Sequence, residues 1–161
     1  MAHYAKLGLD NIVLSVEVVD TIDCMTRGGI EREEIGLEKL QQHSGHMIWK
    51  KCSFNTREGV RVDPVTNEVI PDSVGFRANY PSIGWYYSTE HDLFHPPRPT
   101  DEDGDLMNSW TLNTTTGMWD PPMVKPTLTD EQMETTMYRW DESAHQADNT
   151  TGWVLRDRFP E

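Results

Sequence analysis

Histidines are the first side chains of this sequence that could bind a metal ion or carry a proton. His43 and His46 are spaced like two metal ligands, but Ser44-Gly45 ends the predicted helix that would align them. His91 and His95 flank a predicted turn. A zinc site needs three or four converging ligands, and neither pair supplies them by itself. We therefore interpret these histidines as surface residues near turns, and we expect no bound metal and no cofactor.

The sequence has two cysteines, Cys24 and Cys52, and Cys24 together with a histidine is a possible catalytic pair. They form no Cys-x-x-Cys half-site, and two thiols in a chain of this length fit a reducing compartment, where they pack as small hydrophobic residues. A disulfide between them stays open at this point. The sequence has no Gly-x-Ser-x-Gly motif, and Gly28-Gly29 leads to Ile30-Glu31-Arg32 without the Lys-Ser/Thr of a phosphate loop. The sequence therefore predicts that the chain is not an enzyme.

An acidic run, Asp101-Glu-Asp-Gly-Asp105, resembles part of a calcium-binding loop. The full twelve-residue pattern would place a carboxylate seven residues after Asp105, but Leu112 occupies that position. The run falls between two predicted hairpins, where a solvated acidic segment is common. Calcium binding at Asp101–Asp105 stays open.

Charge excludes several classes of partner. The 161 residues carry a formal net charge of −13, which opposes binding to nucleic acid or to an anionic membrane. The excess is uneven, because residues 1–99 have a balance of −4 and residues 100–161 a balance of −9. This asymmetry indicates that the two parts of the chain have different roles. We expect no apolar membrane span and no secretory signal.

The elements that must position these side chains begin with a strand–helix–strand unit. Residues 12–19 are rich in β-branched residues and predict a strand, and a turn at 8–11 lets residues 3–6 pair back on it. Residues 30–43 show the apolar spacing of an amphipathic helix that ends at Ser44-Gly45, and residues 47–54 alternate like a strand. Residues 60–70 predict a hairpin.

A second part of the chain is built on aromatic hairpins. Tyr86-Tyr87 and Leu93-Phe94 flank a polar stretch, and Pro96-Pro97 follows; residues 110–122 repeat this plan with Trp110, Trp119 and Pro121-Pro122. Residues 138–155, with Trp140 and Trp153, form a looser third copy without the prolines. We interpret each copy as a hairpin with cross-strand aromatic pairs, and the Pro-Pro steps as extended arms. Such rings fill cores and anchor protein interfaces; a sugar-binding surface is the other interpretation.

Several stretches within residues 1–125 carry a recognisable pattern. They are Met1–Lys6 before the Val-rich strand, Trp49–Gly59, Phe76–Tyr86, Phe94–Pro99, Ser109-Trp110 and Trp119–Pro122. Together they resemble a family of small proteins from tailed phages of marine bacteria, cyanophages in particular. The resemblance implies a virion-associated protein and supplies no catalytic residues. Pro81-Ser82 replaces the glycine-rich bend expected from the family, and the last third is longer and more acidic, so its binding surface would be specific to this chain.

We therefore predict an α+β fold, a small antiparallel or mixed sheet with one helix at residues 1–75, followed by tandem β-hairpins at residues 76–161 that pack on the first part or on a partner. The expected function is that of a structural protein of a phage virion, made in the host cytoplasm, whose partners are capsid or tail proteins or a second copy. A tail-fibre assembly chaperone and a carbohydrate-binding host-recognition module are the alternatives. The predicted partner-binding residues are Tyr87, Phe94, Pro96, Pro97, Trp110, Trp119, Pro121, Pro122, Trp140 and Trp153.

Overall fold

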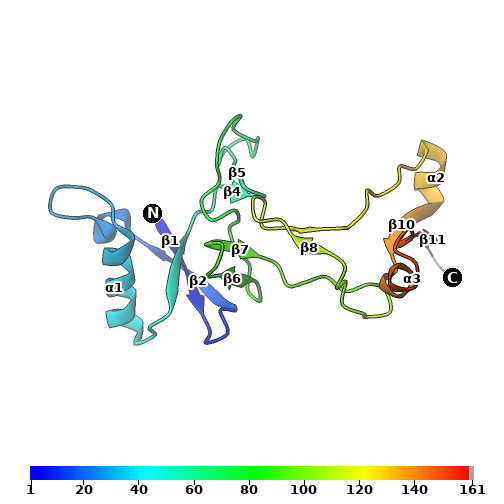
Figure 1. Cartoon of the computed structure of the whole chain (residues 1–161). Coiled ribbons are helices and arrows are strands. Elements are labelled where there is room, and N and C mark those ends of the chain that lie inside the picture. The colour runs from blue at the N-terminus through cyan, green and yellow to red at the C-terminus, as the bar shows by residue number, and fades with distance from the viewer. Residues whose placement is uncertain (160–161) are drawn as a thin grey trace. The chain divides into compact units, whose positions relative to one another are not determined.

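The computed structural model describes residues 1–159, and these residues divide into two compact units (Figure 1). Unit 1 comprises Met1–Pro97 and Asn113–Met118, and unit 2 comprises Arg98–Leu112 and the chain from Trp119 onward. Three α-helices and eleven short strands are present in the described part of the chain, and the sheets are antiparallel. The predicted α+β class is confirmed.

The division between the units falls at Pro97, whereas the sequence placed it after residue 75. The predicted boundary lies inside unit 1, because Tyr87 and Phe94 of the first aromatic hairpin belong to the same buried cluster as Ala5, Leu7 and other residues of the first sheet. A hairpin that contributes its rings to a core cannot separate from that core without exposing them to water.

A three-stranded antiparallel sheet with the order β2-β1-β3 forms the centre of unit 1 (Figure 1). Its strands are β1 (Ala2–Leu7), β2 (Val13–Val19) and β3 (Trp49–Cys52). A short 3-10 helix, η1 (Thr21–Cys24), and the helix α1 (Glu33–Ser44) connect β2 to β3. The strand–helix–strand prediction is confirmed, including the pairing of β1 with β2 across the turn at residues 8–11.

Each face of this sheet has its own apolar cluster. On one face Tyr4 packs with Cys24 and Trp49, and Leu37 and Leu40 of α1 cover them. On the opposite face, Ala5, Leu7 and Val13 pack with Cys52, Tyr87 and Phe94. The alternation of Tyr4 and Ala5 between the two faces is the two-residue period of a strand.

The two cysteines are therefore in different clusters, one on each side of the sheet. Both Cys24 and Cys52 are buried free thiols. The disulfide that the sequence left open does not form, because the sheet lies between the two sulfur atoms.

The helix α1 begins three residues later than Ile30, where the sequence placed its start. Residues 25–31 instead fold back as a turn, with an isolated bridge between Met25 and Glu31 and a hydrogen bond from the Arg32 amide to the Cys24 carbonyl (2.8 Å). The helix ends where predicted, because Gly45 adopts a left-handed conformation (φ 71°) that closes the last turn.

The remaining strands of unit 1 form two small hairpins. They are β4 (Thr56–Arg57) with β5 (Val60–Arg61), and β6 (Tyr86–Ser88) with β7 (Leu93–His95). Tyr87 lies directly opposite Phe94, which confirms the predicted cross-strand pair; the ring centroids are 5.2 Å apart. The predicted hairpin at residues 60–70 is present as a bridge between Val62 and Val69 that extends from β5.

Unit 2 contains two further hairpins and two short helices. Its elements are β8 (Thr111–Leu112), β9 (Trp119–Asp120), α2 (Asp130–Thr135), β10 (Thr136–Trp140), α3 (Glu142–Ala147) and β11 (Trp153–Asp157). The sequence interpretation missed both helices. A capping box signals the start of α2, because Thr129 caps the helix and Gln132 reaches back to the Thr129 amide (3.0 Å).

One predicted cross-strand pair does not form in unit 2. Leu112, not Trp110, lies opposite Trp119 in the β8–β9 hairpin. Trp110 packs instead on Trp140 and Trp153, which lie opposite each other in β10 and β11.

Among residues 1–159, no helix has the length and apolar character needed to cross a membrane.

Candidate functional site

The predicted partner-binding residues fall into two groups once their burial is known. Tyr87, Phe94 and Trp140 are almost fully buried, with 5%, 0% and 3% of their surface exposed. These three rings are core residues, so their predicted role as anchors on a partner is wrong. A hairpin aromatic has the same sequence pattern whether its ring faces the core of its own unit or an external partner.

The other predicted residues keep some surface in contact with water. Trp110, Trp119 and Trp153 are half-buried, as are Pro96 and Pro121, while Pro97 and Pro122 are exposed. Trp119 is covered by Arg98, whose guanidinium carbon lies 4.1 Å from the ring centroid. All six tryptophans are buried or half-buried. A flat exposed tryptophan, which the glycan-binding interpretation requires, is not among them.

The core of unit 2 is a cluster of three indole rings, Trp110, Trp140 and Trp153, with centroid separations of 5.2 to 6.1 Å. Edge-to-face geometry at these distances is favourable for aromatic rings. The Cβ of any residue at Gly152 would lie 2.5 Å from a ring carbon of Trp140, so only glycine fits there. The tryptophans therefore hold the third hairpin to the segment before β8.

A buried carboxylate, Glu142, lies beside this cluster with 4% of its surface exposed. It accepts hydrogen bonds from the Ser109 amide (2.9 Å), the Ser109 hydroxyl (2.7 Å), the Trp140 indole (2.9 Å) and the Gln146 amide group (2.8 Å). Burial opposes the charge, but these donors outweigh it and lower the pKa of Glu142 to about 2. All of its partners are structural, so Glu142 is an ionised cross-link between the segment at Ser109 and helix α3.

The acidic run Asp101–Asp105 is also used structurally. Asp101 accepts backbone hydrogen bonds from Asp103 (3.1 Å) and Asp105 (2.9 Å) through one oxygen, and from Glu142 (3.1 Å) through the other. Glu102 forms ion pairs with two arginines of β10 and β11. No group of three or more histidine, cysteine or acidic side chains within residues 1–159 is arranged to hold a metal ion.

A cluster of charged residues in unit 1 forms around Arg77. The Arg77 side chain, of which 10% is exposed, donates to Asp92 (2.7 Å) and to both Glu33 and the Lys51 carbonyl (2.8 Å each). The Lys51 amide also donates to Glu33 (3.0 Å), so Glu33 and Arg77 together occupy the outer edge of β3. Burial disfavours the charge of Arg77, but these two carboxylates raise its pKa. The N–H and C=O of Lys51 on this strand edge are therefore not available for pairing with another chain.

The loop that carries Arg77 is conformationally strained and tightly held. Arg77 and Ala78 both adopt left-handed conformations (φ 53° and 60°), which cost about 1 kcal/mol or more for a residue other than glycine. Asn79, 3% exposed, fixes the loop from inside, because its amide group donates to the carbonyls of Phe94 (3.0 Å) and Thr116 (2.9 Å). This second bond connects the loop to the turn at residues 113–118, which belongs to unit 1.

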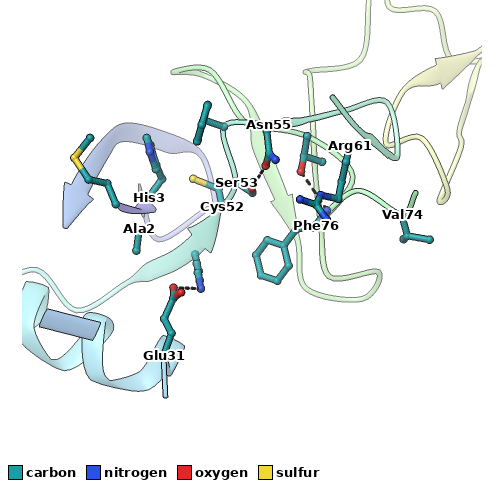
Figure 2. Close-up of a pocket in the computed structure, with 13 residues that line it drawn as sticks. Ala2, His3, Glu31, Cys52, Ser53, Asn55, Arg61, Val74 and Phe76 are labelled. Carbon is teal, nitrogen blue, oxygen red and sulfur yellow. Dashed lines mark hydrogen bonds and ion pairs between the residues drawn. The ribbon is translucent and has the colours of Figure 1, made fainter. Parts of the chain in front are cut away.

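A pocket of about 380 Å³ lies beside the end of β3 (Figure 2). We call it the β3 pocket. Its lining comprises Met1, Ala2, His3, Glu31, Lys51, Cys52, Ser53, Phe54, Asn55, Thr56, Arg61, Val74 and Phe76. In Figure 2, Ala2 and His3 stand on one side, and Phe76, Arg61 and Val74 on the other. Sequence reasoning missed this pocket, because its residues come from five separate segments with no common spacing.

Several turns and extended segments carry large apolar residues that are exposed to water. Leu9 in the β1–β2 turn is 96% exposed, Val65 and Ile83 in two further turns are 90% and 74% exposed, and Val124 in an extended segment is 92% exposed. Turn tips normally carry polar residues. We call these four residues the apolar tips.

Comparisons of the chain with known proteins return no match: no family model, no curated protein and no solved structure is significantly similar. The resemblance to phage proteins stays a prediction.

Proposed function

We propose that this chain is a non-enzymatic structural protein of a tailed-phage virion that attaches to the capsid or tail surface. The observation that carries the proposal is the set of apolar tips, Leu9, Val65, Ile83 and Val124, which expose 74% to 96% of their surface to water. A binding partner would remove this apolar surface from water, at about 1.5 to 3 kcal/mol for each fully buried side chain. The tips replace the buried rings Tyr87, Phe94 and Trp140 as the proposed anchors.

The construction of the loops supports an adhesive role. The turn containing Ile83 is held on β2 by hydrogen bonds from the Gly84 amide to the Val13 carbonyl (2.9 Å) and from the Val13 amide to the Trp85 carbonyl (2.7 Å). Val65 stands in a turn in which Asp63 accepts from two backbone amides (2.8 and 2.9 Å). Ordered turns lose less conformational entropy on binding than flexible ones.

The buried ionisable groups also fit a structural protein. Arg77 and Glu142 each have several protein partners, and the contacts of Arg77 with Glu33 and of Glu142 with Ser109 connect segments that are distant in sequence. The net charge of −13 supports the same proposal, because it keeps a protein with exposed apolar side chains dispersed before assembly.

Quantitative mass spectrometry of gradient-purified virions from the phage that encodes the chain tests the proposal. A structural protein is expected at a fixed ratio to the major capsid protein, and the ratio is expected to survive repeated banding. Presence in the infected-cell lysate combined with absence from virions would refute the proposal and favour the tail-fibre assembly chaperone.

A variant set tests the anchors themselves. The triple change Leu9→Ser, Val65→Ser and Ile83→Ser is expected to lower incorporation into virions at least about ten-fold, since three buried apolar contacts are lost. The matched control is Leu14→Ser, which alters an exposed apolar residue (47%) on a strand rather than at a tip. Unchanged incorporation of the triple variant would exclude the tips as anchors.

A further inference from the structure

Two donor groups in the lining of the β3 pocket are left without a protein acceptor in the described part of the chain. The Arg61 guanidinium and the side-chain nitrogen of Asn55 have no hydrogen-bond or ion-pair partner among residues 1–159. The Asn55 oxygen accepts from the Ser53 hydroxyl (2.5 Å), which leaves the amide nitrogen as the free end of this side chain. A ligand that satisfies these groups must present acceptor oxygens.

The charge of the lining favours an anion. Lys51 forms an ion pair with Glu31, and Arg61 remains as a positive charge without a carboxylate. His3 adds no charge at neutral pH, because burial lowers its pKa, and its ring contacts Tyr80 (Nδ1 to hydroxyl oxygen, 3.1 Å). Arg61 is exposed, so a ligand in the pocket can reach its guanidinium. A carboxylate matches its planar fork of donors in two parallel hydrogen bonds.

Two aromatic rings give the pocket an apolar component. Phe54 and Phe76 are 53% and 41% exposed, and each is supported from one side. The His3 ring lies 5.3 Å from the Phe54 centroid, and the Arg77 guanidinium carbon lies 4.9 Å from the Phe76 centroid. The lining thus combines flat apolar rings with polar groups of Ser53 and Asn55, in a volume of about 380 Å³. This volume lies within the usual range of small-ligand sites.

We propose that the β3 pocket binds an acidic saccharide, a sugar ring that carries a carboxylate. The C–H face of a pyranose covers a phenylalanine ring, its hydroxyl oxygens accept from Asn55, and its carboxylate pairs with Arg61. A simple aliphatic acid would leave the rings uncovered, and a neutral sugar would leave Arg61 unpaired. This inference is independent of attachment to a virion, since the apolar tips do not line the pocket.

Titration of the full-length ¹⁵N-labelled protein with trigalacturonate, followed by NMR, tests the proposal. Saturable shifts are expected in the amide signals of residues 53–56, 61 and 76, with a dissociation constant of about 1 mM or lower. Maltotriose, which lacks the carboxylate, and propionate, which lacks the ring, are each expected to bind at least about ten-fold more weakly. No saturable shift with trigalacturonate at about 10 mM, or equal binding of either comparison ligand, would overturn the proposal.

Two variant pairs assign the roles of the side chains. Arg61→Gln is expected to weaken trigalacturonate binding about ten-fold, whereas Arg57→Gln, an exposed arginine of the same hairpin outside the pocket, is expected to leave it unchanged. Phe54→Leu removes the ring but keeps an apolar side chain, and Phe159→Leu is its exposed control. An equal loss in Arg61→Gln and Arg57→Gln would show general charge attraction and refute the site. The spectra of all four variants report directly whether unit 1 remains folded.

Discussion

Replacing Glu142 by glutamine tests whether an ionised carboxylate holds unit 2 together. The change keeps the shape of the side chain and removes its charge. Glu142 is 4% exposed and accepts four hydrogen bonds, from two groups of Ser109, from Trp140 and from Gln146. Glutamine has one acceptor oxygen instead of two, so its own NH₂ group must face at least one of these donors. We expect Glu142→Gln to destabilise unit 2.

The size of the effect follows from the pKa. An unperturbed glutamate has a pKa of 4.5, and the pKa of Glu142 is about 2 in the folded chain. The ionised form is therefore favoured by folding by about 3 kcal/mol, since each pKa unit corresponds to about 1.4 kcal/mol. Glu142→Gln should lower the free energy of unfolding of unit 2 by about 2 to 4 kcal/mol at neutral pH.

The pH dependence separates this mechanism from a loss of packing. Because the pKa of Glu142 is lower in the folded chain, its stabilisation is complete above the unfolded pKa of 4.5 and is lost as the pH falls toward about 2. The difference in unfolding free energy between the native chain and Glu142→Gln should therefore shrink steadily over this range.

Urea unfolding followed through the indole proton signal of Trp140 measures this difference locally, because that indole donates to Glu142 (2.9 Å). Glu131→Gln is the control for loss of one negative charge, since Glu131 is exposed on α2, and it should change stability by less than about 0.5 kcal/mol. The reasoning is refuted if Glu142→Gln lowers the free energy of unfolding by the same amount at low and neutral pH, or by no more than Glu131→Gln does.

Three further outcomes are expected in unit 1. Asn79→Ala should lower the unfolding free energy by about 3 kcal/mol in urea titrations and increase hydrogen exchange of the Gly117 amide, because the Asn79 amide group no longer holds the turn at residues 113–118. Arg77→Lys should lower the free energy of unfolding by about 2 kcal/mol or more, since a lysine cannot reproduce the three contacts of the guanidinium. A chemical denaturation midpoint equal to that of the native chain would contradict this prediction. Burial raises the pKa of the Cys52 thiol to about 12, and Cys24 is also buried, so both thiols should resist alkylation in the folded chain and react in denaturant. Because neither cysteine is in a disulfide, dithiothreitol should leave the midpoint of thermal unfolding unchanged.

The sequence predicted the elements whose signals are local. The β-branched run of β2, the apolar spacing of α1 and its glycine stop identified the first sheet and helix, and the pattern around the turn at residues 89–92 predicted the pair of Tyr87 with Phe94. The boundaries were less accurate, as for α1, because the turn at residues 25–31 satisfies its backbone groups by a bridge that no periodicity reveals.

These local sequence patterns do not predict which side chains are buried or which polar groups meet across long stretches of sequence. Tyr87, Phe94 and Trp140 were assigned to a partner because an aromatic repeat does not tell which surface its rings meet. Arg77 meets Glu33 and Asp92, which are 44 and 15 residues away in the sequence, and no spacing rule connects them. The α2 start is different, since its Thr129–Gln132 capping box was visible in the sequence and was overlooked.

Short strands explain why this chain depends on buried polar groups. Apart from the sheet of β1, β2 and β3, its hairpins in unit 1 have strands of two or three residues, and isolated hairpins are barely stable in water. Arg77 and Asn79 supply the cross-links that ladder hydrogen bonds would otherwise provide, and each is almost enclosed by its partners. A buried polar group left without its partners is costly, so these contacts favour one path of the loops over alternatives. The Asn79 side-chain oxygen also accepts from the Glu58 amide (2.7 Å), in the turn of the β4–β5 hairpin that carries Arg61. Asn79→Ala should therefore weaken the trigalacturonate binding proposed for the β3 pocket, although Asn79 does not line it.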